Sequence, residues 1–291
     1  IHSLLKSFFK FIFKNTDHFL AKSTRIAFHK KFKSFGKHLF YENKTESYIL
    51  NRNETISNSI FINDEFDFDK IKKVLKIIKK KYYLVDIGAN IGSISLPAIK
   101  RNYFKQAICF EPDKASFRLL KANILINDIE NKMSAFNLAI SDKKGTKKLL
   151  SDNKYNRGNN MLVGNSAKTS KNITLVKTDI LDNFCSKLNK GNALIKIDVQ
   201  GHEGDILKKA KKTLTKKIPI MLEFEPVTMK KNWINDYKYL FMHYNFFYNI
   251  NDLNLKKNKL TINALDELYN SHLKKKNVHR SFIYLRVYYE I

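Results

Sequence analysis

Two stretches of the chain combine acidic side chains with glycine in a pattern that suits chemistry on a bound cofactor. In residues 82–92 an apolar run reaches Asp86 and then breaks into glycine, and in residues 193–204 a second apolar run reaches Asp198 and does the same. Such short apolar runs are typical of buried parallel strands, and ligands bind where parallel strands end. We therefore expect Asp86 and Asp198 to lie at one edge of one sheet.

The first stretch predicts a nucleoside site. Gly88 and Gly92 let the backbone turn sharply and approach a ligand where a Cβ would collide. Their GxxxG spacing is neither the dinucleotide fingerprint nor the phosphate-binding P-loop. The next apolar run along the chain, residues 106–110, is followed by Glu111. A carboxylate at such a strand end can accept hydrogen bonds from both ribose hydroxyls. The two signals together indicate a nucleoside cofactor without a phosphate tail.

Five segments, in the same order, resemble the FkbM family of class I S-adenosylmethionine-dependent methyltransferases. They read VDIGANIGSISL, CFEPDKASFRLLKANILIN, AISDKKG, LIKIDVQGHEGDILKKA and MLEFEP, and they fall within residues 82–226. The resemblance implies an α/β, Rossmann-like fold whose doubly wound sheet has seven strands and an antiparallel final strand. It also implies S-adenosyl-L-methionine as the cofactor.

The resemblance supplies a set of cofactor-binding residues. A third strand, residues 133–140, is expected to end beside the adenine ring. The predicted contacts are Asp86, Gly88, Ala89, Asn90, Gly92, Glu111, Pro112, Asn137 and Ala139.

The predicted catalytic residues are Asp198, His202 and Glu223. His202 is expected at a helix N-terminus, where the helix dipole disfavours the imidazolium and leaves a neutral proton acceptor; a side chain that only caps or packs is the alternative. In the fifth strand, residues 218–224 and the acids at its end, alternation points either Glu223 or Glu225 inward, and the resemblance favours Glu223.

These residues predict methyl transfer to oxygen. The sulfonium carbon of the cofactor is electrophilic, whereas an alcohol is a poor nucleophile until its proton is removed. We expect His202 or Asp198 to be the base and Glu223 to orient a hydroxyl of a sugar, a glycan, a glycolipid or a related small molecule. The family usually has Glu at the position of Gln200, so a role that needs charge there is in question. Oxygen ligands for Mg²⁺ exist, but no metal is expected to be required.

The charge of the chain motivates a second hypothesis. With 54 basic and 27 acidic residues the chain has a net charge of +27, which could attract nucleic acid, anionic lipid or acidic glycan, or could reflect composition drift. No DPPY or NPPY tetrapeptide follows the fourth strand, which argues against base N-methylation, and no separate RNA-binding module is evident, which argues against nucleic acid as a partner. A ribose methyltransferase is the alternative, and a non-catalytic cofactor-binding subunit is a third possibility.

The N-terminal part, residues 1–80, is predicted as a basic helical segment and cap, and residues 81–291 as the methyltransferase domain. Residues 1–40 carry nine Lys or Arg and one acid among many phenylalanines, so they could lie on an anionic membrane surface, or pack on the catalytic domain or on a second subunit. Residues 41–63 predict a hairpin, including alternation over 56–62, and residues 64–80 an amphipathic helix.

Two further expectations concern the surroundings of the protein. Its two cysteines have no metal-ligand spacing and no disulfide framework, and no run of about eighteen apolar residues occurs. A cytoplasmic location, peripheral at the membrane surface if residues 1–40 bind it, fits best.

The polar insertion 142–180 is expected to form a lip of the site, where Arg157 either pairs with an anionic substrate group or is solvated.

Overall fold

The computed structural model describes residues 37–291 except 79–80, 152–155, 165–171, 227–228, 230–232, 253, 275–282 and 289–291. Residues 1–36, on which the expected membrane-surface helix depends, lie outside the described residues, so that expectation stays a prediction. Among the helices that are described, none combines the length and apolarity needed to cross a bilayer.

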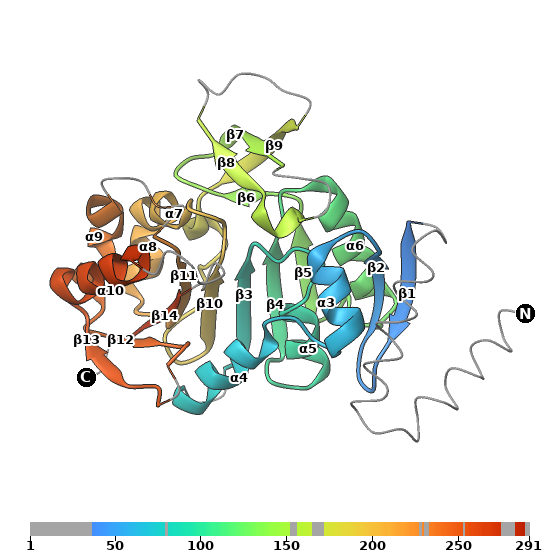
Figure 1. Ribbon diagram of the computed structural model, residues 1–291, viewed down its shortest axis with the longest axis horizontal. Helices are drawn as coiled ribbons and strands as arrows, with labels where there is room; N and C mark the ends of the chain where they lie inside the picture. The colour runs from blue at the N-terminus through green and yellow to red at the C-terminus, as the bar shows by residue number, and fades with distance from the viewer. Residues whose placement is uncertain are drawn as a thin grey trace, which may run out of the picture.

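An eight-stranded sheet forms the centre of the molecule, in the order β13-β12-β14-β11-β10-β3-β4-β5 (Figure 1). Its strands are β3 (Tyr83–Ile87), β4 (Gln106–Phe110), β5 (Met133–Phe136), β10 (Ala193–Ile197), β11 (Ile220–Phe224), β12 (Phe246–Asn249), β13 (Lys257–Lys259) and β14 (Ile283–Tyr288). From β5 to β11 all neighbours are parallel, while β14 is antiparallel to β11 and β12. The predicted doubly wound sheet is confirmed, with β13 as an eighth strand where seven were expected.

Helices cover both faces of this sheet, because its central strands are apolar on both sides. One face packs against α3 (Thr55–Asn63), α4 (Phe68–Ile77), α5 (Ser95–Lys100) and α6 (Lys114–Leu125). The other face packs against α7 (Glu203–Lys209), α8 (Lys211–Thr215), α9 (Trp233–His243) and α10 (Ile262–Lys274). The result is the three-layered architecture that the βα rhythm of the sequence predicts.

The cap, residues 37–78, differs from its prediction in one element. A hairpin does form, from β1 (His38–Glu42) and β2 (Ser47–Asn51), but residues 56–62, expected to be extended, belong to helix α3. Glu54 caps this helix by accepting a hydrogen bond from the amide of Ser57, and Ile56 and Ile60 are buried one helical turn apart. The cap side chains share a core with α5 and α6, so cap and catalytic domain pack as one body over the described residues.

A second, four-stranded sheet stands over the carboxyl ends of the central strands (Figure 1). It comprises β6 (Ala139–Ile140), β7 (Gly145–Leu150), β8 (Met161–Val163) and β9 (Ile173–Asp179), in the order β6-β9-β7-β8. The prediction of one strand over 133–140 is wrong, because the chain turns after β5 and β6 pairs with β9 in this small sheet. The expected lip therefore exists as a folded sheet.

Candidate functional site

A cavity of about 240 Å³ opens where β3, β4, β10 and β11 end. Three parts of the chain line it: the loops after these strands, the small sheet with the 3-10 turn η1 (Arg157–Asn159), and the cap. The turn lies against the cap, since a Cβ on Gly158 would be 3.1 Å from Ile56 Cδ1. The site is thus enclosed by elements that are far apart in the sequence.

Glycine is required at both predicted positions of the first loop. Gly88 has φ +82°, and a Cβ there would lie 1.9 Å from the carbonyl oxygen of Asp198. Gly92 has φ +88°, and its Cβ would meet Leu120 at 3.0 Å. The loops after β3 and β10 therefore touch backbone to backbone, and Gly88 lines the cavity.

The carboxylate at the end of β4 fixes the first loop. Glu111 is 6% exposed, and its two oxygens accept hydrogen bonds from the amides of Asn90 and Asp113, each at 2.8 Å. Burial raises the pKa of this carboxyl to about 8, although the two amide hydrogen bonds oppose the shift. Glu111, Asn90 and Pro112 all line the cavity, as the cofactor-site prediction requires.

Four of the predicted cofactor residues do not line the cavity. Asp86, Ala89 and Gly92 lie behind its wall, and Asn137 donates from its side chain to the carbonyls of Glu111 and Pro112 at 2.9 and 3.0 Å. Asn137 thus fastens the loop after β4. Ala139, predicted to lie beside the adenine ring, does line the cavity, together with Leu138 and Ile140.

Lys196 is a site residue that sequence reasoning missed. Its ammonium lies 3.1 Å from Asp86 Oδ1 and 3.5 Å from Asp198 Oδ2, and it donates to the carbonyl of Gly88 at 3.0 Å. Burial lowers the pKa of Lys196, but the charges of Asp86 and Asp198 outweigh burial and hold the pKa above its ordinary value. The available signal was a lysine between two isoleucines of a buried strand, two residues before Asp198.

Three polar side chains gather on the side of the cavity formed by β10 and β11. The amide nitrogen of Gln200 donates to both oxygens of Glu223, at 3.1 and 3.0 Å, and lies 3.4 Å from Asp198 Oδ1. Burial, with the charges of Asp198 and Glu203, raises the pKa of Glu223 well above its ordinary value. Of the two acids at the end of β11, Glu223 lines the cavity and Glu225, also buried, does not, in line with the preference for Glu223.

The expected position of His202 in the crevice is corrected by the structure. The imidazole is 6% exposed and does not line the cavity, because its Nε2 is 2.9 Å from Ser141 Oγ and its Nδ1 is 3.0 Å from Asp205 Oδ2. The packing alternative describes this histidine better. Its neighbour Glu203 closes the same turn, accepting from the amides of Val199 and Gly201 at 3.0 and 3.3 Å.

The residues present fit a nucleoside that carries a sulfonium. Glu111 offers carboxylate oxygens for ribose hydroxyls, and the glycine backbone leaves room for close approach. The apolar side chains of Phe110, Leu138 and Ile140 line the cavity and can cover a purine. Asp198 and Glu223 line the same cavity. Across the described residues, no cluster of His, Cys, Asp or Glu is arranged to hold a metal ion.

Similarity to known proteins agrees with this geometry. The family model of the methyltransferase FkbM domain matches residues 86–254. The 2-O-methyltransferase NoeI of Sinorhizobium fredii is 30% identical over 154 residues, which are 48% of this chain and 62% of NoeI. A tRNA(Phe) (4-demethylwyosine(37)-C(7)) aminocarboxypropyltransferase of Pyrococcus horikoshii is 36% identical over 73 residues, 25% of this chain and 26% of that enzyme.

A solved structure, the methyltransferase FkbM of Methylobacillus flagellatus, is 14% identical to this chain and aligns with a TM-score of 0.43. The alignment covers 72% of this chain and 44% of the chain of the solved structure. The chain spans less than two thirds of each of these three proteins. The match to the family model, by contrast, covers more than half of the chain and includes every strand end that lines the cavity. The protein therefore belongs to the FkbM family of S-adenosylmethionine-dependent methyltransferases.

Proposed function

We propose that this protein transfers the methyl group of S-adenosylmethionine to a hydroxyl of a sugar, in a glycan, a glycolipid or a related small molecule. The observation that carries the proposal is the group of Asp198, Gln200 and Glu223 beside the Gly88 loop. The cofactor supplies an electrophilic methyl carbon, to which the hydroxyl oxygen bonds as the carbon–sulfur bond breaks. The chain must orient that hydroxyl, take its proton and exclude water.

Asp198 is the proton acceptor in this proposal. It lines the cavity, its side chain is 21% exposed, and its backbone oxygen is packed on Gly88. The nearby ammonium of Lys196 and amide of Gln200 hold the carboxylate in one orientation. Glu223 is more deeply buried and orients the acceptor. His202, held outside the cavity by Ser141 and Asp205, is left with a packing role.

The charges in the cavity favour a neutral, hydroxyl-rich acceptor over a phosphate-bearing one. Four lining residues are carboxylates and three are cationic. Each of these cations is already next to a carboxylate: Lys70 to Asp67 at 2.6 Å, Arg157 to Asp113 at 3.4 Å, and Lys196 to the two acids described above. The net charge of +27 is therefore not concentrated at the site, and phosphates would meet carboxylates there.

The test is transfer of a labelled methyl group to two panels of acceptors. Purified protein is incubated with S-adenosylmethionine labelled at the methyl group and either neutral oligosaccharides or transfer RNA. The name of NoeI, a 2-O-methyltransferase, supports transfer to oxygen, and the names of the tRNA enzymes among the relatives make transfer RNA the second candidate acceptor. Labelled RNA with unlabelled oligosaccharides would overturn the sugar assignment. Cofactor binding with no transfer to either panel would point to a non-catalytic subunit.

The role of Asp198 has a separate test that needs no acceptor. Sinefungin carries an amine where the cofactor carries its methyl sulfonium, whereas S-adenosylhomocysteine is uncharged at that position. Asp198→Asn should weaken sinefungin binding about tenfold more than S-adenosylhomocysteine binding, because a carboxylate close to the amine is lost. His202→Gln is the control and should weaken both ligands equally. Equal effects of Asp198→Asn on the two ligands would show that the Asp198 carboxylate does not lie beside the methyl group of the cofactor.

A further inference from the structure

The chain between α3 and α4, residues 64–67, contributes to the part of the cavity wall that belongs to the cap, beside Thr55 and Ile56; we refer to residues 64–67 as the cap corner. Phe66 and Asp67 of this corner line the cavity, together with Lys70 from the first turn of α4. No other acid or aromatic side chain of the described cap lines it. The corner shares the cavity with Asp198 and Glu223, the residues proposed to act on the acceptor.

The backbone of the cap corner is strained at both ends. Asp64 has φ +68° and Asp67 has φ +56°, both in the left-handed region that costs a residue other than glycine about 1 kcal/mol or more. Asp67 precedes α4, yet its side chain makes no capping hydrogen bond. It binds the ammonium of Lys70 at 2.6 Å instead and reaches the cavity. Such strain persists only where the surrounding structure holds it, and it concentrates at ligand sites.

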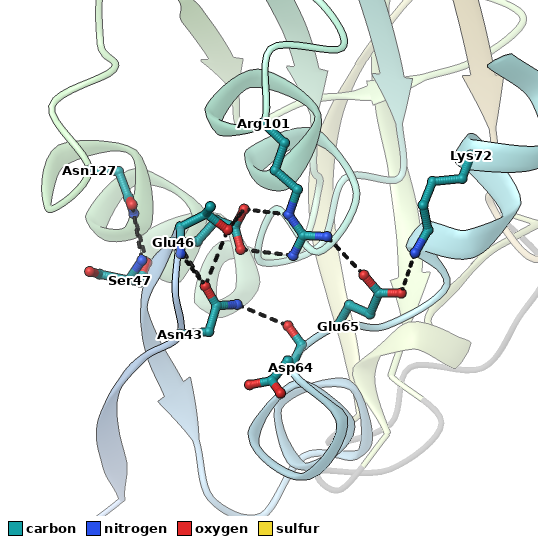
Figure 2. Close-up of polar contacts among 9 residues, drawn as sticks. Asn43, Glu46, Ser47, Asp64, Glu65, Lys72, Arg101 and Asn127 are labelled. Carbon is teal, nitrogen blue, oxygen red and sulfur yellow. Dashed lines mark hydrogen bonds and ion pairs between the residues drawn. The ribbon is translucent and has the colours of Figure 1, made fainter. Parts of the chain in front are cut away.

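A polar network behind the cap corner holds it in place (Figure 2). Arg101, at the end of α5, donates to both oxygens of Glu46 at 2.7 and 3.0 Å and to Glu65 at 2.9 Å. The side chain of Glu46 is fully buried, and Glu65 also binds Lys72 at 2.8 Å. A forked arginine between two carboxylates fixes the direction of both, so Glu65 is turned away from the cavity that Phe66 faces.

The hairpin fastens the start of the corner. Asn43 donates from its side chain to the carbonyl of Asp64 at 3.1 Å, and the hydroxyl of Tyr41 donates to the Asp64 carboxylate. Figure 2 shows Asn43 reaching from the hairpin toward Asp64, while Arg101 reaches down from α5 to Glu46 and Glu65. The corner is thus clamped between β1–β2 and α5, and its two cavity-facing side chains are presented in a fixed geometry.

We propose that Phe66, Asp67 and Lys70 form a subsite for a neutral sugar ring of the acceptor, and that Arg101 is the residue that positions it. The proposal rests on the proposed function and names where that acceptor binds. The ring of Phe66 can cover the apolar face of a sugar, Asp67 can accept from its hydroxyls and Lys70 can donate to them. Because the corner is held before the ligand arrives, little ordering is needed on binding.

The experiment measures binding of free sugars, independently of methyl transfer. The methyl glycosides of glucose, galactose, fucose and N-acetylglucosamine are titrated against the full chain with bound S-adenosylhomocysteine, and binding is followed by saturation-transfer NMR. Phe66→Leu and Asp67→Asn should each weaken the glycoside that binds wild type by about tenfold, the loss of one hydrogen bond to a charged group or of an aromatic contact. The affinity for S-adenosylhomocysteine should stay within twofold.

Two further variants separate positioning from general damage. Asp69→Asn changes an exposed acid two residues from Asp67 that does not line the cavity, and it should bind glycosides as wild type does. Arg101→Lys keeps the charge but loses the fork, so it should weaken glycoside binding while cofactor affinity is retained.

The inference is overturned if no glycoside saturates on wild type, or if Phe66→Leu and Asp67→Asn bind like wild type. Binding of glycosides without methyl transfer in the acceptor panels would support the subsite and defeat the proposed reaction. If both variants transfer methyl groups to an oligosaccharide with unchanged KM, the proposed reaction would be supported and the subsite defeated. The two proposals therefore fail separately.

Discussion

Replacing Lys196 by methionine separates two roles that this side chain combines. The substitution keeps the volume of the side chain but removes the ammonium, leaving Asp86, whose carboxylate is 0% exposed, without the cation 3.1 Å away. Removing one partner of a buried ion pair costs about 3–5 kcal/mol, because the remaining charge stays buried. For a chain of this size the melting temperature should fall by roughly 10 °C.

The double variant Asp86→Asn with Lys196→Met is the informative comparison. It removes both charges, so most of the lost stability should return. The affinity for S-adenosylhomocysteine should not return, because Lys196 also donates to the carbonyl of Gly88 at 3.0 Å and neither variant restores that contact. Loss of a hydrogen bond from a charged donor predicts about tenfold weaker binding in both variants.

Thermal unfolding and calorimetric titration with S-adenosylhomocysteine measure the two effects. Lys81→Met is the matched control, since this second buried lysine donates to the carbonyls of Lys190 and Gly191 at the amino end of β3, away from the cavity. It should leave cofactor affinity unchanged. A Lys196→Met protein as stable as wild type, or a double variant that regains full affinity, would refute the assignment of these roles.

Three further outcomes follow from the geometry. Gly88→Ala should abolish measurable S-adenosylhomocysteine binding, because its Cβ would lie 1.9 Å from the carbonyl of the neighbouring loop, whereas Gly145→Ala, with φ +151° and open space around it, should bind normally in the same titration. Burial raises the pKa of Glu111 to about 8 from an ordinary 4.5, so between these pH values the folded chain binds more protons than the unfolded chain. The free energy of unfolding should therefore fall as pH rises from 4.5 to 8. Urea titrations at several pH values should show a smaller fall for Glu111→Gln. Asn123→Ala should lower the free energy of unfolding by about 2–5 kcal/mol in the same urea assay. The fully buried side chain of Asn123 accepts a hydrogen bond from the amide of Ile49 at 2.6 Å and donates one to the carbonyl of Ile91 at 3.0 Å, and both backbone groups would lose their partner.

The strand ends of the site were predictable because local chemistry determines them. The run before Glu111 is a strand with the bounds expected, residues 106–110, and Asp113 caps the next helix through the amides of Ala115 and Ser116. Glycine at position 88 follows from the turn itself, which needs a positive φ. In each case one residue and its immediate neighbours carry the signal.

The errors have a different origin, since they concern contacts between distant segments. The spacing of Ile56 and Ile60 fits both a strand and a helix, and only the packing of this segment on the cap core decides for the helix. His202 was expected in the crevice because it follows the end of β10, but Ser141, which follows β6 of the small sheet, contacts its ring at Nε2. Lys196 was missed because its partner Asp86 lies on the neighbouring strand.

Gln200, where the family usually has Glu, is explained by the charges around it. Three carboxylates already meet at this turn, and burial together with their mutual repulsion raises the pKa of both Glu203, to about 7, and Glu223. Gln200, at φ +55°, supplies the donor that both oxygens of Glu223 accept and that also lies near Asp198. A glutamate there would add a fourth acceptor in place of this donor.

The proposed chemistry does not depend on a charge at position 200. In the proposed reaction Asp198 takes the proton of the acceptor and Glu223 orients the acceptor, and the neutral amide of Gln200 contacts both carboxylates. The departure from the family pattern was the only sequence feature that suggested a non-catalytic subunit. Since Gln200 completes the hydrogen bonding of the acidic side of the cavity, that feature is compatible with an active methyltransferase.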